Sequence, residues 1–304
     1  MDKQTYLIIL LVGQLALVLL DIRERYRSRR DNVDAGRLRP MSIVFLVGVG
    51  LVYGGLQFGG LALVPNAEQL LDLSRSFTNE LFGVGTGGVS IALVIATGIA
   101  GFYFAGLCDY LFHRFASHSR PLWFSHENHH LTTDVSAFMP GLCVRPFAVI
   151  IVFPTSAAAI FAVQMSLGAM GQNSWDMMPM LYAVIVAQAA VLGITHTAFM
   201  RRHWWLHRLL QPLGITTPQE HWLHHTSDLE CNYGNFTIVW DRVFGTYVDP
   251  ESVNLEEHRA GLSYEQDFLG AITLGRLKLP QSVRDRYQLD QFCYLGDKPH
   301  ALQK

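Results

Sequence analysis

The chain alternates between long uncharged blocks and short polar links. The blocks run over Gln4–Leu20, Pro40–Ala67, Leu81–Cys108, Pro146–Trp175 and Met177–Met200. A bilayer core needs roughly 20 predominantly apolar residues per helix, so four blocks can span it and the first is only just long enough. Buried helices of soluble proteins rarely run beyond about 14 residues without a charge. The pattern therefore predicts transmembrane helices over about 4–20, 41–65, 82–108, 146–167 and 178–200.

Composition agrees with a membrane location. Hydrophobic residues make up 50% of the chain and charged residues 16%, with a mean hydropathy of +0.21, which is more apolar than a soluble domain of this length. We expect an all-α integral membrane protein with four to five transmembrane helices and a cytosolic, histidine-rich helical cap formed by 109–145 and 201–304. No internal repeat or long flexible linker divides the chain, so 1–304 is expected to be a single membrane-embedded domain.

The basic residues predict how the chain is oriented. The link 21–39 holds seven arginines, whereas the link 66–80 holds only Arg75. The positive-inside rule then places the first link in the cytoplasm, and every histidine cluster falls on the same side. A cleaved signal peptide is the alternative for the first block, but no small-residue cleavage site follows Leu20. The cysteines lie on the cytoplasmic side or at its boundary, form no CxxC pair and receive no function; they are Cys108, Cys143, Cys231 and Cys293.

Two histidine boxes share one spacing. "HENHH" contains His126, His129 and His130, and "HWLHH" contains His221, His224 and His225. Positions i, i+3 and i+4 of an α-helix lie on one face, so each box is predicted to aim three imidazoles at a common point. The alternative for a single box, a solvated helix face, becomes hard to sustain when the box occurs twice.

Other histidines extend this set. His113 and His118 are five residues apart and do not share a face of a regular helix, so we expect the helix to end or bulge near "SHSRP". His196 lies at the cytoplasmic end of the last block, where an ionisable residue is a functional candidate. His203 and His207 are weaker candidates, because Trp-rich interfacial segments often contain histidine without a metal.

These nine principal imidazoles predict a metal centre. A single ion of four to six ligands cannot use them all, so two ions are the economical interpretation, although imidazole alone suits zinc, copper, iron or nickel. Neutral ligands also call for carboxylates behind them, which orient the rings. The acidic residues close in sequence, each with the alternative of being an ordinary solvated acid, are Asp109, Glu127, Asp134, Glu220, Asp228 and Asp241.

Four motifs carry a family resemblance: "YLFHRFASH", "HENHH", "TPQEHWLHH" and "NYGNFTIVWDRVFGTYVDP". Over about 100–250 they resemble the fatty acid hydroxylase, or sterol desaturase, superfamily of membrane di-iron oxygenases. The resemblance implies a catalytic membrane bundle with a cytosolic cap, two irons, O2 as co-substrate, and hydroxylation or desaturation of a fatty acyl, sterol or related lipid. The ligands it implies are His113, His118, His126, His129, His130, His196, His221, His224 and His225. The first-box spacing is that of fatty acyl and carotenoid hydroxylases, while the tail resembles sterol-desaturase-like bacterial members, so the subfamily stays open.

The expected partners follow from this chemistry. We expect a lipid substrate, no nucleic acid, and an external electron-transfer protein of cytochrome b5-like or ferredoxin-like type, because the chain has no heme, flavin or Rossmann fingerprint. Arg201, Arg202 and Arg208 can receive an acidic donor or serve as topology determinants. A bacterial inner membrane is favoured over the endoplasmic reticulum, since no retention signal ends the sequence. The alternatives are a zinc-dependent membrane hydrolase or lyase and a transporter or metal-storage protein.

The tail after the third box reads as a tight cap that packs aromatics beneath the site, because it mixes Gly234 and Gly245 with Trp240 and Phe244. Asp241 and Arg242 within it are expected to form a buried pair or a contact behind the metal ligands, with an ordinary surface pair as the alternative. "RRHWWLHRLLQPL" has the composition of an interfacial helix, and "FLGAITLGRLKL" is a second candidate for membrane contact.

Overall fold

The protein is built from helices. The structure is a computed structural model that describes residues 3–31, 65–85, 90–130, 148–172, 176–226, 230–258, 260–261, 280 and 282. Within these ranges, β structure is limited to two isolated bridges, Ile215 with Thr237 and Thr226 with Ala260. The expected all-α class is therefore confirmed for the described part of the chain.

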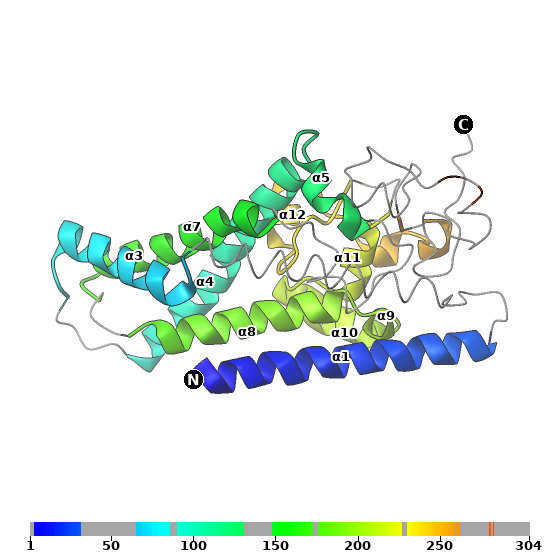
Figure 1. Cartoon of the computed structure of the whole chain (residues 1–304), viewed down its shortest axis with the longest axis horizontal. Helices are drawn as coiled ribbons and strands as arrows, with labels where there is room; N and C mark the ends of the chain where they lie inside the picture. Colours follow the sequence, from blue (N-terminus) through cyan, green and yellow to red (C-terminus); the bar gives the residue numbers. More distant parts are fainter. Residues whose placement is uncertain are drawn as a thin grey trace.

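Long helices form the elongated body of the molecule. They are α1 (Lys3–Asp31), α3 (Ala67–Phe82), α4 (Ile91–Phe112), α7 (Ala148–Ala169) and α8 (Met178–Thr195). Helix α7 packs against both α3 and α4, and α8 lies between α4 and α1, as Figure 1 shows. Buried Leu71, Leu167 and Met180 form an apolar cluster where α3, α7 and α8 approach one another.

Short helices gather at the opposite end, next to the C-terminal ends of α4 and α8 (Figure 1). They are the π-helix η1 (His113–Ser117), α5 (Trp123–His126), η2 (Glu127–His130), α9 (Ala198–Arg201), α10 (Trp204–Leu210), η3 (Gln211–Leu213), α11 (Pro218–His224), α12 (Val239–Phe244), η4 (Pro250–Ser252) and η5 (Leu255–Glu257). This end of the molecule, called the cap below, carries all the histidine boxes.

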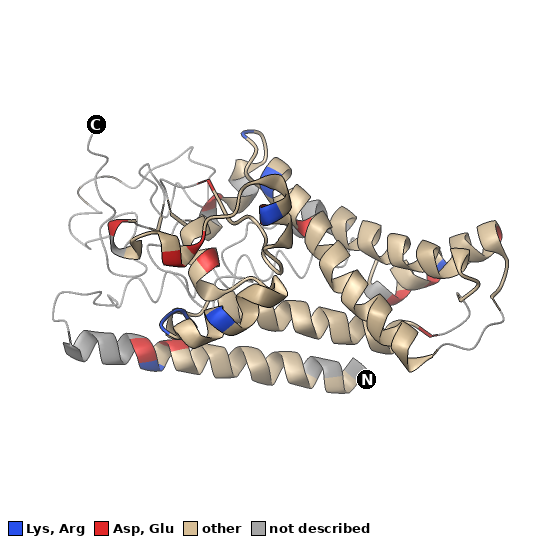
Figure 2. Cartoon of the chain, turned by 180° about the vertical axis from the view of Figure 1, so that it is seen from behind, with Lys and Arg blue, Asp and Glu red and all other residues tan. Residues whose placement is uncertain are grey.

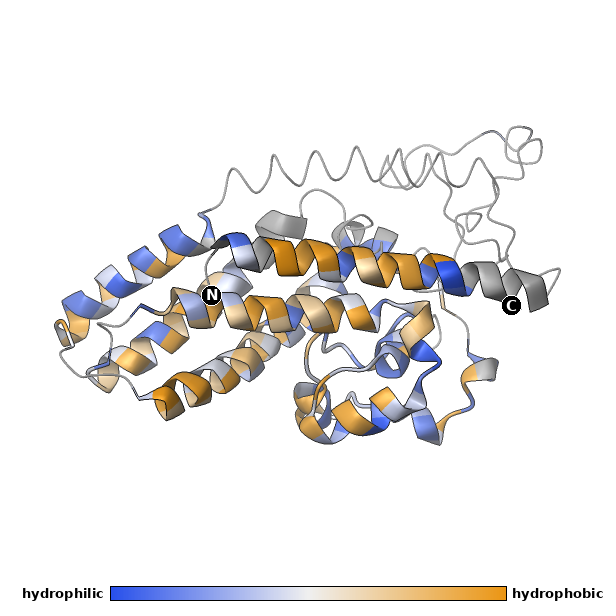
Figure 3. Cartoon of the chain, turned by 90° about the horizontal axis from the view of Figure 1, so that it is seen from below, coloured by the Kyte–Doolittle hydropathy of each residue, from blue (hydrophilic) through white to orange (hydrophobic). Residues whose placement is uncertain are grey.

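Two described helices are long and apolar enough to cross a bilayer, Ile91–Ser117 and Met178–Thr195. Only 11% and 22% of their apolar windows are buried, whereas the core helix of a soluble protein would be mostly covered. Hydrophobic residues run along α1 and α8 in Figure 3, and charged residues are sparse on α4 and α8 in Figure 2. These exposed apolar faces indicate a membrane location. The predicted count of four to five spans is not confirmed, and the span predicted over 41–65 lies outside the described residues.

Several predicted helix boundaries were wrong. The helix predicted over 82–108 begins only at Ile91, where the Ser90 hydroxyl accepts from the Leu93 amide at 3.2 Å, and it runs on to Phe112 and then into η1. The first helix continues past the predicted residue 20 to Asp31, and the fourth, Ala148–Ala169, is shifted from 146–167.

The last predicted span, 178–200, is interrupted at Thr195. The Thr195 hydroxyl donates to the Leu192 carbonyl at 2.9 Å, and the Thr197 hydroxyl donates to the Gly193 carbonyl at 2.6 Å. Threonine side chains that bond to the preceding turn in this way compete with the helical pattern. The interruption leaves His196 in a turn between α8 and α9.

Candidate metal centre

The first histidine pair is brought together by a change of helix type. Helix α4 passes into the π-helix η1, in which the His118 amide donates to the His113 carbonyl at 3.1 Å. A bond between residues five apart widens the turn, so the two side chains meet on one side, with ring centroids 5.0 Å apart. The predicted bulge or helix end near "SHSRP" is confirmed.

The second and third boxes lie on short helices. His126 ends α5, and His129 and His130 lie in the 3-10 helix η2. His221 and His224 belong to α11, which begins with a capping box between Thr217 and Glu220, and His225 follows as its C-cap. The capping box fixes the start of α11 and thereby the rotation at which its histidines face the interior.

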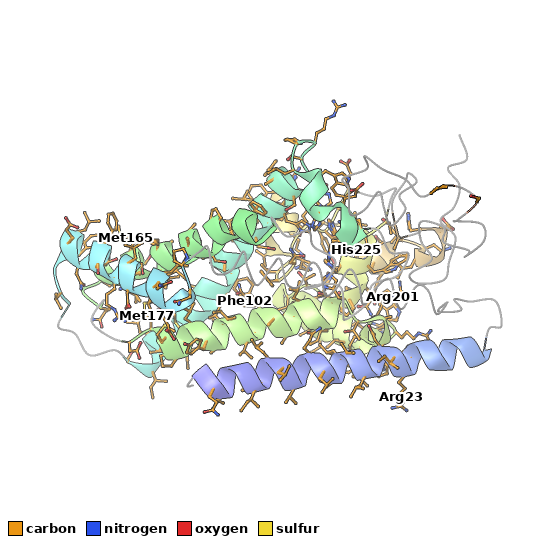
Figure 4. The ribbon with its side chains drawn as sticks, in the orientation of Figure 1. Arg23, Phe102, Met165, Met177, Arg201 and His225 are labelled. Carbon is orange, nitrogen blue, oxygen red and sulfur yellow. The ribbon has the colours of Figure 1, made fainter. Side chains whose placement is uncertain are left out.

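The nine histidines converge as two adjacent groups whose candidate ligand atoms lie within 4.8 Å of one another in each group. The five-histidine group contains His113, His118, His126, His130 and His224. The four-histidine group contains His129, His196, His221 and His225. Figure 4 shows His225 in the interior of the cap end, far from Met165 and Met177 at the other end of the body.

The boxes are divided between these groups, which corrects the expectation of one common point for each box. His126 and His130 of the second box enter the five-histidine group while His129 enters the other. The third box does the reverse, with His221 and His225 in the four-histidine group and His224 in the five-histidine group. Positions i+3 and i+4 point about 100° apart around a helix. A helix that lies between two ions can therefore direct one histidine to each of them.

The spacing of the ring nitrogens fits metal ions. In the four-histidine group, His196 Nε2 lies 3.1 Å from His129 Nε2 and 2.8 Å from His221 Nε2. In the five-histidine group, His126 Nε2 lies 2.9 Å from His113 Nε2 and 3.1 Å from His130 Nε2. Metal–imidazole bonds of about 2.1 Å that meet at a right angle place two nitrogens about 3 Å apart.

Backbone carbonyls determine which ring nitrogen of three histidines keeps a lone pair for a metal. In the five-histidine group, His113 Nδ1 donates to the Tyr233 carbonyl at 2.5 Å, and His224 Nδ1 donates to the Cys231 carbonyl at 3.0 Å. In the four-histidine group, His196 Nδ1 donates to the Leu192 carbonyl at 2.8 Å. A neutral imidazole that donates through Nδ1 presents a lone pair at Nε2, the arrangement usual for metal-bound histidine. The buried Nε2 atoms of His118 and His224 have no hydrogen-bonding partner among the described residues. The residues present therefore fit a pair of cations.

The rings are neutral at physiological pH. Burial, followed by the closeness of other imidazoles, lowers the pKa of His129, His221 and His225 well below the usual 6.5. The same causes lower the pKa of His126 and His130. Metal binding requires deprotonated imidazole, so these rings are ready to coordinate without first losing a proton.

The "NYG" loop, residues 232–234, supports the five-histidine group on its α12 side. Asp241, fully buried on α12, accepts from the Tyr233 amide at 2.7 Å, the Gly234 amide at 2.9 Å and the Thr246 hydroxyl at 2.8 Å. A Cβ on Gly234 would lie 2.1 Å from the Thr237 carbonyl oxygen, so only glycine fits. The loop thus holds the Tyr233 carbonyl where it accepts from His113.

Aromatic packing ties this loop to α4, as predicted for Trp240 and Phe244. Trp240 Nε1 donates to the Tyr103 carbonyl at 2.8 Å, and Phe244 stacks on Tyr110 with centroids 5.3 Å apart. Tyr233 also covers His118 and His224, at centroid distances of 5.1 and 5.3 Å. These rings close the site toward α12 and exclude water from it.

The predicted carboxylates act behind the histidines or elsewhere. Asp109 accepts from Asn235 Nδ2 at 3.1 Å, and that amide nitrogen lies 3.3 Å from His113 Nδ1. Glu220 accepts from the Thr217 amide at 2.8 Å and from the Tyr247 hydroxyl at 3.1 Å. Glu127 is buried beside the second box. Asp134 and Asp228 lie outside the described residues.

Asp241 and Arg242 do not pair with each other; of the alternatives, Asp241 makes the contact behind the metal ligands, through the loop whose Tyr233 carbonyl bonds His113. Asp241 points into the "NYG" loop, whereas Arg242 lies over the Tyr247 ring at 4.8 Å. Neighbouring helix positions point about 100° apart, which directs the two side chains to different surroundings.

The remaining candidates fall outside both groups. His203 Nδ1 donates to the Phe199 carbonyl at 2.9 Å, and His207 bonds the Thr217 hydroxyl at 2.8 Å. Arg202 pairs with Glu24, Arg208 with Glu251, and Arg201 lies over Trp222. Cys108 and Cys231 form no disulfide with each other. Cys143, Cys293 and the "FLGAITLGRLKL" segment lie outside the described residues.

Some functional contacts had no signal in the histidine spacing. Tyr233, Asn235 and Trp123 contact the histidines, Trp123 with His118 and His130 at 5.3 and 5.4 Å between centroids. The "NYGN" motif directly after the third box was the available clue for the first two of these residues.

The central part of the chain is similar to a known protein family. Residues 98–246, which hold all nine histidines, match the family model described as Fatty acid hydroxylase. This half of the chain is a fatty acid hydroxylase domain. The hydroxylase domain begins within α4 and ends after α12, so α1, α3 and the segment from 250 onward flank it.

Two relatives are alkylglycerol monooxygenases. That of Danio rerio is 28% identical over 155 residues, or 47% of this chain. That of Xenopus tropicalis is 26% identical over 152 residues, or 46% of this chain. In both cases the match covers 28% of the relative's own length. No solved structure matches the chain.

Proposed function

We propose that the protein is a di-iron oxygenase that oxidises a C–H bond of a membrane lipid, by hydroxylation or desaturation, with O2 as co-substrate. The observation that carries the proposal is the pair of adjacent, all-imidazole groups within a fatty acid hydroxylase domain. Five and four histidines exceed what one structural zinc ion uses. This count favours two redox-active ions over the zinc hydrolase or lyase alternative.

The residues that would hold the irons are the nine histidines of the two groups. When bound, the iron pair supplies the activation of O2 and the removal of hydrogen from an unactivated C–H bond. The chain itself orients the imidazoles through the carbonyls of Tyr233, Leu192 and Cys231. It also keeps the site dry, because most of the ligand rings are almost fully buried.

The substrate would reach the site from within the bilayer. Helices α4 and α8 end at His113 and His196, two of the nine histidines, next to apolar faces suited to lipid. The exposed Trp205 and Leu209 of α10 are consistent with an interfacial helix beside this entrance. We place this face on the cytoplasmic side of a bacterial inner membrane, in accordance with the arginine-rich link after the first apolar block.

The relatives suggest the first substrate to test. Both are named as monooxygenases of alkylglycerols, so an ether-linked glycerolipid is the leading candidate among fatty acyl, sterol and related lipids. Electrons would come from a cytochrome b5-like or ferredoxin-like protein docking at the cap. Arg208, exposed at the surface, is available for an acidic donor although it also pairs with Glu251.

The test compares lipids of host cells that carry the intact gene or a His129→Ala version, with His203→Ala as a matched control that lies outside both groups. A lipid that gains one oxygen atom, or loses two hydrogen atoms, should appear with the intact and His203→Ala genes only. Labelled O2 should enter the product of a hydroxylation. A product that forms equally well without O2 would instead support the zinc enzyme.

A further inference from the structure

We propose that α1, a helix outside the hydroxylase domain, positions His196 for metal binding through Asp21 and Glu24. The inference rests on the proposed metal binding by the four-histidine group. It assigns a role in the site to acidic residues that lie far from the histidine boxes in sequence and at the cytoplasmic end of an apolar helix.

Helix α1 packs closely against α8 just before His196. A Cβ on Gly193 would lie 2.6 Å from Leu17 Cδ1 and 3.1 Å from Gln14 Oε1. Glycine therefore lets the two helices pack closely within the last turn of α8, which ends at Thr195. The position of α1 consequently sets the position of the last turn of α8.

Asp21 holds the chain just after His196. Its Oδ1 accepts from the Phe199 amide at 3.2 Å, and its side chain is buried at 1% exposure. Thr197, the N-cap of α9, makes no side-chain capping bond, and its hydroxyl donates to the Gly193 carbonyl. An acceptor for an amide in the first turn of α9 is thus supplied by a different helix.

Glu24 holds the other end of α9. It forms an ion pair with Arg202, the C-cap of α9, and its side chain is 7% exposed against 57% for Arg202. Asp21 and Glu24 are three residues apart and share one face of α1. Helix α9 is therefore held at both ends by carboxylates of α1, and the turn that contains His196 is fixed on both sides.

This arrangement matters because His196 links two ligands. Its Nε2 lies 3.1 Å from His129 Nε2 and 2.8 Å from His221 Nε2. Metal–ligand distances tolerate deviations of only about 0.2 Å. A small shift of the α8–α9 turn would move this nitrogen out of range, whereas no ligand of the five-histidine group lies on that turn.

The test is the release of bound metal from purified protein into excess chelator, followed by metal analysis. The wild type should release its ions in two phases, one of which His196→Ala removes. Asp21→Leu, which loses the acceptor, should accelerate that same phase about tenfold, as losses behind a ligand do. Asp21→Asn keeps an acceptor oxygen and should stay within about twofold of wild type. Exposed Arg23 provides the control Arg23→Leu, which should change neither phase.

Two outcomes would overturn the inference: Asp21→Leu behaving as Arg23→Leu does, or both phases accelerating equally. If Asp21→Leu does not fold, Glu24→Gln, which retains the shape but not the charge, should accelerate the same phase, and an unchanged phase there refutes the role. The proposed function fails separately. In that case metal is bound and released as described, but no O2-dependent lipid product forms.

Discussion

Asp241→Ala should loosen the five-histidine group without touching any of its ligands. The carboxylate accepts from the Tyr233 and Gly234 amides and the Thr246 hydroxyl. Burial raises the pKa of Asp241 to about 6, so at pH 7.5 it is ionised and available to all three donors. Alanine removes these acceptors and leaves the loop that carries the Tyr233 carbonyl without its anchor.

The magnitude follows from the groups left unpaired. Thr246 retains the Tyr110 hydroxyl at 2.9 Å, whereas the two backbone amides lose their acceptor. Each buried unsatisfied amide costs about 1–3 kcal/mol, so the loss is about 4 kcal/mol. For a chain of this size that corresponds to a melting temperature lower by roughly 10 °C. The five-histidine group should also bind metal about tenfold more weakly, because His113 loses its fixed partner.

The assay is thermal unfolding in detergent at pH 7.5, with metal content measured on the same samples. Arg242→Ala is the matched control, since that side chain contacts the Gln211 carbonyl at 3.4 Å and the Tyr247 side chain, and supports no amide of the loop. Asp241→Asn, which keeps one acceptor oxygen, should fall between the two. The reasoning would be refuted if Asp241→Ala melted within about 2 °C of Arg242→Ala and kept its full metal content.

Three further predictions concern the cap. Thr217→Val removes the side-chain cap of α11 and the hydroxyl partner of His207, and should cost about 2–4 kcal/mol in unfolding free energy, measured by denaturation. No change is expected for Ser252→Ala, at an exposed position. His196→Ala should lower the amount of metal bound per chain, while His203→Ala should leave it unchanged. An equal loss of metal in both variants would contradict a metal site that includes His196 but not His203. Burial lowers the pKa of histidines such as His129 in the folded protein, so the folded state should have its full stability above about pH 6.5. Below that pH the unfolded chain takes up protons and stability should fall, so a melting temperature that stays constant from pH 8 to 5.5 would contradict this.

The sequence was most informative where spacing maps directly onto geometry. Repeated HxxHH boxes predicted that the histidines converge, and the structure gathers all nine of them, although it divides each box between the two groups. The five-residue gap between His113 and His118 required an irregular turn, and η1 provides it. In both cases the prediction depended only on local periodicity.

Other features depend on contacts between distant segments. Which group receives His129 or His224 depends on where η2 and α11 lie between the two sites, and no local pattern encodes that. The early end of α8 arises from threonine hydroxyls that a hydropathy pattern counts as neutral. Asp21 looked like the first polar residue of a link, because its acceptor role depends on Phe199 of another helix.

The division of the boxes between the two groups also bears on how the protein is made. A growing chain that has reached η2 holds four of the five ligands of one group but only His129 of the other. Both groups then wait for α11 and its C-cap, which supply His224 to the first and His221 and His225 to the second. A single late docking event completes both sites together. The ligand sets of both sites are therefore complete only once this one segment has been made.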